Sequence, residues 1–150
     1  MAFYANGGSG TMANQSMTYD TSDNLTTNGF SRTGYDFDGW CLGTTSCATA
    51  DYTDGESVSN LTAVDAATIT MYARWEPIDY TITYNLDGGA CNGGSCTPTS
   101  YNIESATITP PTPAKTGYTF GGWYDNSGLS GINHERIADI KAIRMNIFPQ

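Results

Sequence analysis

Basic residues are scarce in this chain, which limits what it can bind. Only 6 of the 150 residues are Lys or Arg, against 15 Asp or Glu, so the formal net charge is -9. Without a basic patch to neutralise phosphates, the sequence argues against a nucleic-acid partner. An anionic membrane surface also attracts Lys and Arg, and no apolar run approaches the roughly 20 residues that a membrane helix needs. We therefore expect no membrane insertion.

Large aliphatic side chains are also few, since Leu, Ile, Val and Phe together number 22 of 150. With the net charge, that share would be typical of a disordered chain. The 10 Tyr and 3 Trp argue for a folded chain, because aromatic rings bury a large area per residue. The length allows one ordinary domain or two small ones with thin cores.

Two runs of the chain alternate between buried and exposed positions with the period of two that half-buried strands show. They span 68–75 and 80–86, and Thr lies on the opposite face of each. Asn-Gly and Asp-Gly turn signals lie between such runs, and no amphipathic helix precedes residue 132. These patterns predict a mainly β fold. The residues expected on the buried faces are Ile69, Met71, Ala73 and Trp75 in the first run and Tyr80, Ile82, Tyr84 and Leu86 in the second.

The C-terminal tail differs in composition from the rest of the chain. Residues 1–130 carry a net charge of -10, whereas residues 131–150 carry +1 and are rich in Ile. Ile137, Ile140 and Ile143 recur three positions apart. We expect a short helix over Ile132–Phe148, with Ile a middling helix former.

The chain repeats itself. The segment 32–40 reads RTGYDFDGW and returns at 115–123 as KTGYTFGGW, 83 residues later. Upstream, the segment 3–8 reads FYANGG and returns at 83–89 as TYNLDGG, with an offset of 80 or 81. Such self-similarity indicates tandem modules. We assign a first module to 1–76, a second, truncated module to 77–131 and an atypical tail to 132–150.

The repeated motif predicts core packing. Tyr and Phe two positions apart share one face of a strand, and the glycines permit a bulge or a close backbone approach beside the Trp ring. The alternative is an exposed aromatic strip that stacks on sugars. The motif and core residues are Tyr35, Phe37, Gly39, Trp40, Tyr72 and Trp75 in the first module, and Tyr118, Phe120, Gly122 and Trp123 in the second.

The first module carries FYANGGSGTM at 3–12, RTGYDFDGW at 32–40 and TMYARW at 70–75. In order and spacing, these segments resemble the Listeria–Bacteroides repeat, also called the internalin B-repeat-like domain. The second module keeps DGG at 87–89 and KTGYTFGGW at 115–123 but lacks the closing Tyr-Ala-x-Trp strand. The resemblance covers about residues 1–130 and implies that the second repeat is incomplete.

The resemblance implies small, β-grasp-like modules that occur in tandem in secreted or cell-surface bacterial proteins. The family is associated with surface display and adhesion rather than catalysis, and it provides no agreed binding residues to transfer. The chain enters its opening strand midway and shows no secretion signal or wall-sorting motif, so we expect a fragment of a larger exported protein or a changed reading frame after Gly131. Either the second module has an unpaired sheet position or the tail covers it.

The four cysteines allow three pairings. Local disulfides within each module, Cys41–Cys47 and Cys91–Cys96, are the simplest, and they would imply an oxidising, exported location. Free thiols are one alternative. A tetrathiolate zinc site is another, but the usual close spacing of zinc ligands fits only the second pair.

Two acidic turns could attract calcium. Asp20 and Asp23 lie in one turn, and Asp51, Asp54 and Glu56 lie in another. Neither turn matches an EF-hand loop, and Asp is also common in turns for its local hydrogen bonds. We therefore expect no metal site.

The sequence gives no reason to expect an enzyme. His134 is the only His, and no Cys lies near it in sequence. The 15 acidic residues single out no catalytic pair, and the Gly-Gly turns lack the helix and Lys of a phosphate-binding loop. We expect no catalytic residue and no cofactor.

The leading hypothesis is a non-catalytic module of an extracellular or cell-surface protein. One version is a stalk or spacer, since tandem repeats joined by a short linker suit that role. The other is an adhesive module that binds a glycan, or a host or neighbour-cell glycoprotein, through exposed aromatic rings.

Overall fold

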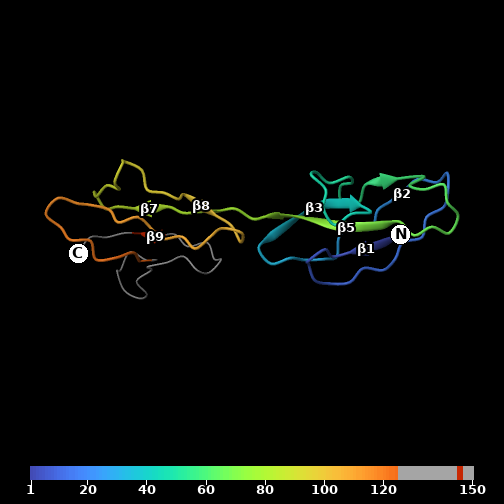
Figure 1. Cartoon of the computed structure of the whole chain (residues 1–150), viewed down its shortest axis with the longest axis horizontal. Coiled ribbons are helices and arrows are strands. Elements are labelled where there is room, and N and C mark those ends of the chain that lie inside the picture. Colours follow the sequence, from blue (N-terminus) through green and yellow to red (C-terminus); the bar gives the residue numbers. More distant parts are fainter. Residues whose placement is uncertain (125–144, 147–150) are drawn as a thin grey trace. The chain divides into compact units, whose positions relative to one another are not determined.

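The computed structural model describes residues 1–124 and 145–146. The chain divides into two compact units, Met1–Pro77 and Ile78–Gln150, and Figure 1 labels most of their strands. Within the described residues there are short strands and no helix, so the expected mainly β class is confirmed. The strands are β1 (Ala2–Tyr4), β2 (Asp23–Asn24), β3 (Tyr35–Leu42), β4 (Ser57–Val58), β5 (Thr70–Pro77), β6 (Tyr80–Thr81), β7 (Tyr84–Asn85), β8 (Ser100–Tyr101) and β9 (Met145–Asn146).

The central sheet of unit 1 has the order β1-β5-β3. β1 pairs with β5 in parallel, with Phe3 opposite Met71 and Tyr4 opposite Tyr72, and β3 pairs with β5 in antiparallel orientation. A separate antiparallel pair joins β2 and β4. The first and last strands of the unit are therefore neighbours. Over the part of the chain that the structure describes, no helix is long and apolar enough to cross a bilayer.

The core of unit 1 is built around the ring of Trp40, which is fully buried. The rings of Phe3 and Phe37 both lie 4.9 Å from it, and the ring of Phe30 lies 6.2 Å away, all measured between centroids. Tilted and edge-on aromatic pairs of this kind add to the stabilisation that burial of their area provides. The alternation expected over 68–75 is confirmed, because Met71 and Ala73 are buried while Ile69 and Trp75 pack against the same cluster.

A β-bulge in β3 explains the Phe-x-Gly-Trp spacing. Phe37 lies opposite Trp75, Gly39 opposite Arg74 and Trp40 opposite Ala73, so Asp38 is an extra residue on β3. Strict alternation would send Phe37 and Trp40 to opposite faces, and the bulge brings both onto the core. Gly39 is required here because its φ is +128° and an added Cβ would lie 2.6 Å from both Ala50 Cβ and the Tyr52 carbonyl oxygen.

Unit 2 contains a smaller core of Ile82, Tyr101 and Trp123. Tyr80, Tyr84 and Leu86 pack against it, so the face expected for the run 80–86 is confirmed. The single strand implied by that run is wrong, because β6 and β7 are separate. β6 pairs antiparallel with β8, whereas β7 pairs in parallel with β9, so the chain changes partner between them.

The repeated motif keeps its glycine conformation and its Phe–Trp contact in both units, although only unit 1 has a strand there. Gly122 has a φ of +119°, close to that of Gly39, and the rings of Phe120 and Trp123 meet edge-on at 5.6 Å. The Gly-Gly turns also agree, since Asn6 and Asp87 have positive φ values of 46° and 44°. At these turns the offset between the units is 81, and carried back to the start of each unit it makes Tyr84 the equivalent of Phe3.

The tail supplies a closing strand to unit 2. Tyr84 on β7 lies opposite Met145 on β9, as Phe3 on β1 lies opposite Met71 on β5, and both pairings are parallel. The helix expected over Ile132–Phe148 is therefore wrong at Met145–Asn146, and its other residues lie outside the described part of the chain. Sheet pairing satisfies the backbone groups of β7, which outweighs the weak helix propensity of an Ile-rich segment. The sequence carried a small signal for this strand, an Ile-x-Met triplet at 69–71 that returns at 143–145.

Replacing Gly39 with Ala tests the bulge. The new Cβ would clash with Ala50 and Tyr52, so we expect unit 1 to lose at least about 2 kcal/mol of unfolding free energy. Gly43→Ala is the matched control, because Gly43 also has a positive φ, +67°, but has nothing within 4 Å of an added Cβ. That variant should lose only about 1 kcal/mol. Hydrogen exchange of the β5 amides under denaturant measures unit 1 separately from unit 2, and equal losses in the two variants would contradict the packing argument.

Candidate functional site

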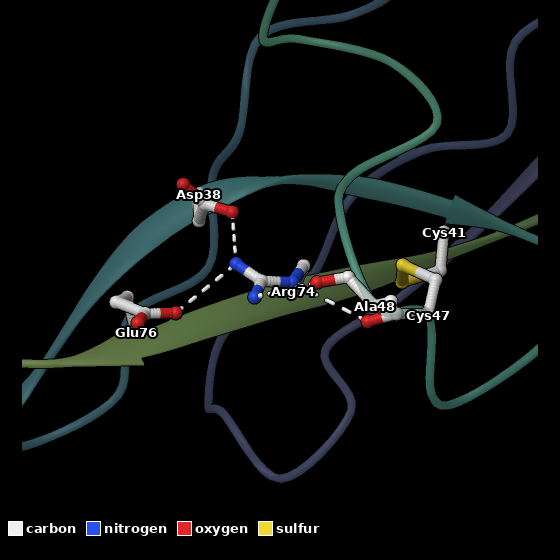
Figure 2. Close-up of polar contacts among 6 residues, drawn as sticks. All are labelled: Asp38, Cys41, Cys47, Ala48, Arg74 and Glu76. Atoms are coloured by element: carbon white, nitrogen blue, oxygen red, sulfur yellow. Dashed lines mark hydrogen bonds and ion pairs between the residues drawn. A yellow bond between two sulfur atoms is a disulfide. The ribbon is translucent and has the colours of Figure 1, made fainter.

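Arg74 joins several parts of unit 1 on the sheet face opposite the aromatic core. It lies on β5 opposite Gly39, and its guanidinium contacts the carboxylate of Asp38, the bulged residue, and that of Glu76 at 3.1 Å. It also donates hydrogen bonds to the carbonyl oxygens of Cys47 at 3.5 Å and Ala48 at 3.2 Å. Figure 2 shows Arg74 between the two carboxylates on one side and the cysteine-closed loop on the other. The bulge therefore places a charge partner for Arg74 as well as a ring in the core.

The loop that Arg74 contacts, residues 41–47, is closed by a disulfide. Cys41 and Cys47 are bonded, with their Cα atoms 5.8 Å apart, and Cys41 is almost fully buried. A second side chain anchors the loop, because Asn6 Nδ2 donates hydrogen bonds to the carbonyl oxygens of Thr45 at 2.8 Å and Ala73 at 2.9 Å. The loop is thus tied to β3 covalently, to β5 through Arg74 and to the end of β1 through Asn6.

Unit 2 has its disulfide in a different loop. Cys91 and Cys96 are bonded, with their Cα atoms 5.3 Å apart, directly after the Gly88-Gly89 turn. All four cysteines are therefore paired locally, and none is free. Among the residues that the structure describes, no group of three or more His, Cys, Asp or Glu side chains is placed to hold a metal ion.

The two repeated motifs contact one another in each unit through a basic residue. The Arg32 guanidinium lies 3.7 Å from the centroid of the Tyr35 ring and covers the turn at Gly7. In unit 2, Lys115 Nζ lies 4.5 Å from the centroid of the Tyr118 ring and donates a hydrogen bond to the Asp87 carbonyl oxygen at 2.7 Å. The basic residue thus fastens the Gly-Gly turn to its own tyrosine, partly through a cation–π contact. This contact gives a structural reason for the pairing of the two motifs in the sequence.

The aromatic residues of the repeated motif do not share one environment. Trp40 and Trp123 are buried, and Phe37 and Phe120 lie half-buried with their rings edge-on to them. Tyr118 is 56% exposed beneath Lys115. The tyrosine is therefore the outermost member in unit 2, whereas Tyr35 is half-buried like Phe37 in unit 1, and in both units the tryptophan contributes packing.

The closing strand β5 carries the other two aromatic motif residues. Tyr72 stacks on the exposed ring of Tyr4, with centroids 5.0 Å apart and planes inclined by 20°. Trp75 donates its Nε1–H to the Ala5 carbonyl oxygen at 2.8 Å. Both contacts tie β5 to β1 or to the turn that follows it.

The acidic turns use their carboxylates to close loops. Asp51 accepts a hydrogen bond from the Leu42 amide and Asp54 one from the Asn28 amide, both at 2.8 Å. Glu56 accepts one from the Thr53 amide at 2.7 Å. In the other turn, Asp20 accepts a hydrogen bond from Asn60 Nδ2 at 2.9 Å and Asp23 one from the Asn24 amide. The bonds of Glu56 and Asp23 are local, as is ordinary for carboxylates in turns, whereas those of Asp51, Asp54 and Asp20 join residues 9, 26 and 40 positions apart.

An open cleft of about 400 Å³ lies at the start of unit 1, lined by Met1, Met17, Tyr19 and the loop 60–67. Asp65 is the one carboxylate among its lining residues, so the cleft does not offer the carboxylate pair that glycoside hydrolysis needs.

In unit 2, burial raises the pKa of Tyr84, whose hydroxyl donates a hydrogen bond to the Pro98 carbonyl oxygen at 2.8 Å. Tyrosine is neutral at neutral pH in any case, so the raised pKa affects stability only in alkaline solution, where its contribution is lost as the pH rises through the pKa of the folded state.

Comparison with known proteins finds a single family over most of the chain. The family model of the Listeria-Bacteroides repeat domain matches residues 1–74 and 80–142. Internalin H of Listeria monocytogenes serovar 1/2a (strain ATCC BAA-679 / EGD-e) is 33% identical over 92 residues, which make up 61% of this chain and 14% of the internalin. The chain therefore spans a small part of the length of this curated relative. No solved structure matches this chain.

Replacing Arg74 with Gln tests the anchoring of the cysteine-closed loop. Surface ion pairs and charged hydrogen bonds of this kind together contribute roughly 1 kcal/mol, so we expect dithiothreitol to reduce Cys41–Cys47 about threefold to tenfold faster. Cys91–Cys96 in the same chain is the internal control and should be reduced at an unchanged rate. Glu76→Gln removes only the outer carboxylate and should have a smaller effect. An unchanged rate for Cys41–Cys47 in Arg74→Gln would contradict the anchoring role.

Proposed function

The chain belongs to the Listeria–Bacteroides repeat domain family, and from this membership we propose that it is a non-catalytic, load-bearing spacer module of an exported bacterial surface protein. Each unit has a core of its own, and only two residues, Ile78 and Asp79, separate β5 from β6. Units joined in series by such short linkers suit an element that sets distance rather than one that encloses a site. The two disulfides support export, because they persist in oxidising locations.

The parallel pairing of β1 with β5 is the observation that carries the load-bearing role. The chain enters unit 1 at Met1, just before β1, and leaves it at Pro77, the end of β5. A pull on these two ends draws two parallel neighbours in opposite directions along their own length. The ladder of hydrogen bonds lies across the strands, so the bonds are loaded together in shear.

Side-chain hydrogen bonds reinforce the same pair of elements. Trp75 on β5 donates to the Ala5 carbonyl oxygen, and Asn6 donates to the Ala73 carbonyl oxygen on β5. Both therefore join the residues that follow β1 to the strand that a pull would slide past it. In unit 2 the parallel pair of β7 and β9 repeats the arrangement.

A second candidate function, binding of a glycan or glycoprotein, is favoured by one surface. The stacked pair of Tyr4 and Tyr72 lies on the sheet face opposite the core, and Tyr4 is 47% exposed. Exposed tyrosine rings provide contact area at a low cost in conformational entropy. Saturable binding to neutral glycans or a mucin that Tyr4→Ser abolishes, with the melting temperature of unit 1 retained, would support this candidate. If a well-folded chain binds nothing in such a panel, the spacer role would be the remaining candidate of the two.

Force spectroscopy on the full chain tests the spacer role. With handles at Met1 and Pro77 the β1–β5 ladder is sheared, whereas with handles at Met1 and Thr68 it is peeled from one end. Since forced unfolding follows the unfolding barrier, we expect at least about a twofold higher unfolding force in shear at the same loading rate. Asn6→Gly accepts the positive φ at this position but loses two hydrogen bonds, so it should lower the shear force. Equal forces in the two geometries would argue against a load-bearing design.

A further inference from the structure

In unit 2, the strand that arrives from the linker completes one edge of the unit. β6 pairs antiparallel with β8, with Tyr80 opposite Tyr101 and Thr81 opposite Ser100, and the Ile82 amide continues the pairing to the Thr99 carbonyl oxygen at 2.8 Å. The rings of Tyr80 and Tyr101 stack with their centroids 5.4 Å apart. Tyr101 is 6% exposed beneath this strand. β6 follows the linker Ile78–Asp79 and precedes β7, the equivalent of β1, so the residues directly ahead of β7 form an edge strand of unit 2.

Unit 1 has the same edge, and it begins in the same way. At the offset of 81, Met1 is the equivalent of Ile82. The Met1 amino group donates a hydrogen bond to the Gln15 carbonyl oxygen at 2.7 Å, and the Gln15 amide donates one to the Met1 carbonyl oxygen at 3.0 Å. This doubly bonded pair is the first rung of an antiparallel ladder.

The next rung of that ladder is open. Doubly bonded pairs recur every second residue along an antiparallel ladder, so the next rung joins Met17 to a residue two positions ahead of Met1. Tyr80 stands two positions ahead of Ile82 in unit 2. Within residues 1–124 and 145–146, the backbone groups of Ser16 and Met17 have no hydrogen-bond partner.

The open cleft of unit 1 lies beside this edge. Met1 and Met17 line it together with Tyr19, Leu61, Val64 and Ile69. Tyr19 is 61% exposed and Val64 is 68% exposed, so the cleft presents apolar surface to solvent. Apolar surface next to unpaired backbone groups is what a strand with one large side chain would cover.

We propose that this edge of unit 1 accepts an extended polypeptide strand that enters directly ahead of Met1 and carries an aromatic residue two positions before it. The segment Asp79-Tyr80-Thr81 is a strand of this chemistry, and its docking onto β8 is the template. In a tandem array, the residues that directly follow the linker would thus form an edge strand of the next unit. The inference rests on the proposed function only in joining units in series, and it does not require them to bear load.

A chain with a copy of residues 76–81 fused ahead of Met1 tests the proposal. The copied tyrosine then stands two positions before Met1, and we expect the amide exchange of Met17 to slow at least tenfold. The matched control is the same extension with Tyr80→Pro in the copy, because Pro lacks the N–H that donates to the Met17 carbonyl oxygen and so removes one of the two bonds that hold the rung. A further extension with Tyr80→Ser keeps the backbone bonds but loses the ring, so it should give intermediate protection.

Equal exchange at Met17 with the tyrosine and proline extensions would overturn the proposal. Protection that grows with protein concentration would also overturn it, since the strand would then come from a second copy of the chain. Amide exchange reports on backbone pairing at Ser16 and Met17, whereas the force experiment reports on the β1–β5 ladder. Failure of the strand docking and failure of the spacer role are therefore distinguishable.

Discussion

The pairing of the first strand of unit 1 with its last is the constraint on which the rest of the unit depends. β1 and β5 are separated by nearly the whole unit, and they meet in parallel, which a hairpin cannot achieve. The segment between them therefore has to cross back over the sheet, and it provides β3 on the far side of β5. Closure places Phe3 and Met71 side by side beneath Trp40, so the core exists only once the two ends of the unit have met.

A unit of this size cannot rely on its core alone. Small domains bury a limited share of their surface and commonly add covalent or polar supports. In unit 1 these supports converge on the sheet face away from the core, where Arg74, Asn6 and the Cys41–Cys47 bond hold one loop. The Asp38 bulge belongs to both sets of contacts, since it turns Trp40 inward and provides a carboxylate for Arg74. A change at the bulge would therefore disturb the aromatic core and the polar anchor together.

Local pattern predicted those features that depend on a residue and its near neighbours. The alternation of Met71 and Ala73, the need for a glycine before Trp40 and the mainly β class all follow from spacing of one to three positions. The role of Arg74 could not be predicted, because its partners come from three separate segments and unit 2 has no counterpart described here. The split of the run 80–86 was missed for a related reason, since a period of two shows which face is buried but not which strand is the partner.

In the closing strand of unit 2, pairing with β7 determines a conformation that the local sequence indicates only weakly. Two identities at the offset of 74, in the Ile-x-Met triplets at 69–71 and 143–145, are too few to predict a strand against an Ile spacing of three. The unpaired edge of β7 favours the strand at Met145–Asn146, because backbone groups at a sheet edge gain hydrogen bonds from any extended segment that reaches them.

The same argument applies at the other edge of each unit. The first two residues of the predicted run 80–86 form β6, and they pair with Ser100 and Tyr101 of β8 rather than with the partner of β7. Pro77 is paired with Tyr35 in the sheet of unit 1, and Asp79 accepts a hydrogen bond from Asn102 Nδ2 in unit 2 at 2.9 Å. Almost every residue of the junction is thus held by one unit or the other. Both edges of unit 2 are therefore completed by segments from the two ends of that unit, β6 at its start and β9 in its tail, so the unit is closed only when both of its ends are in place.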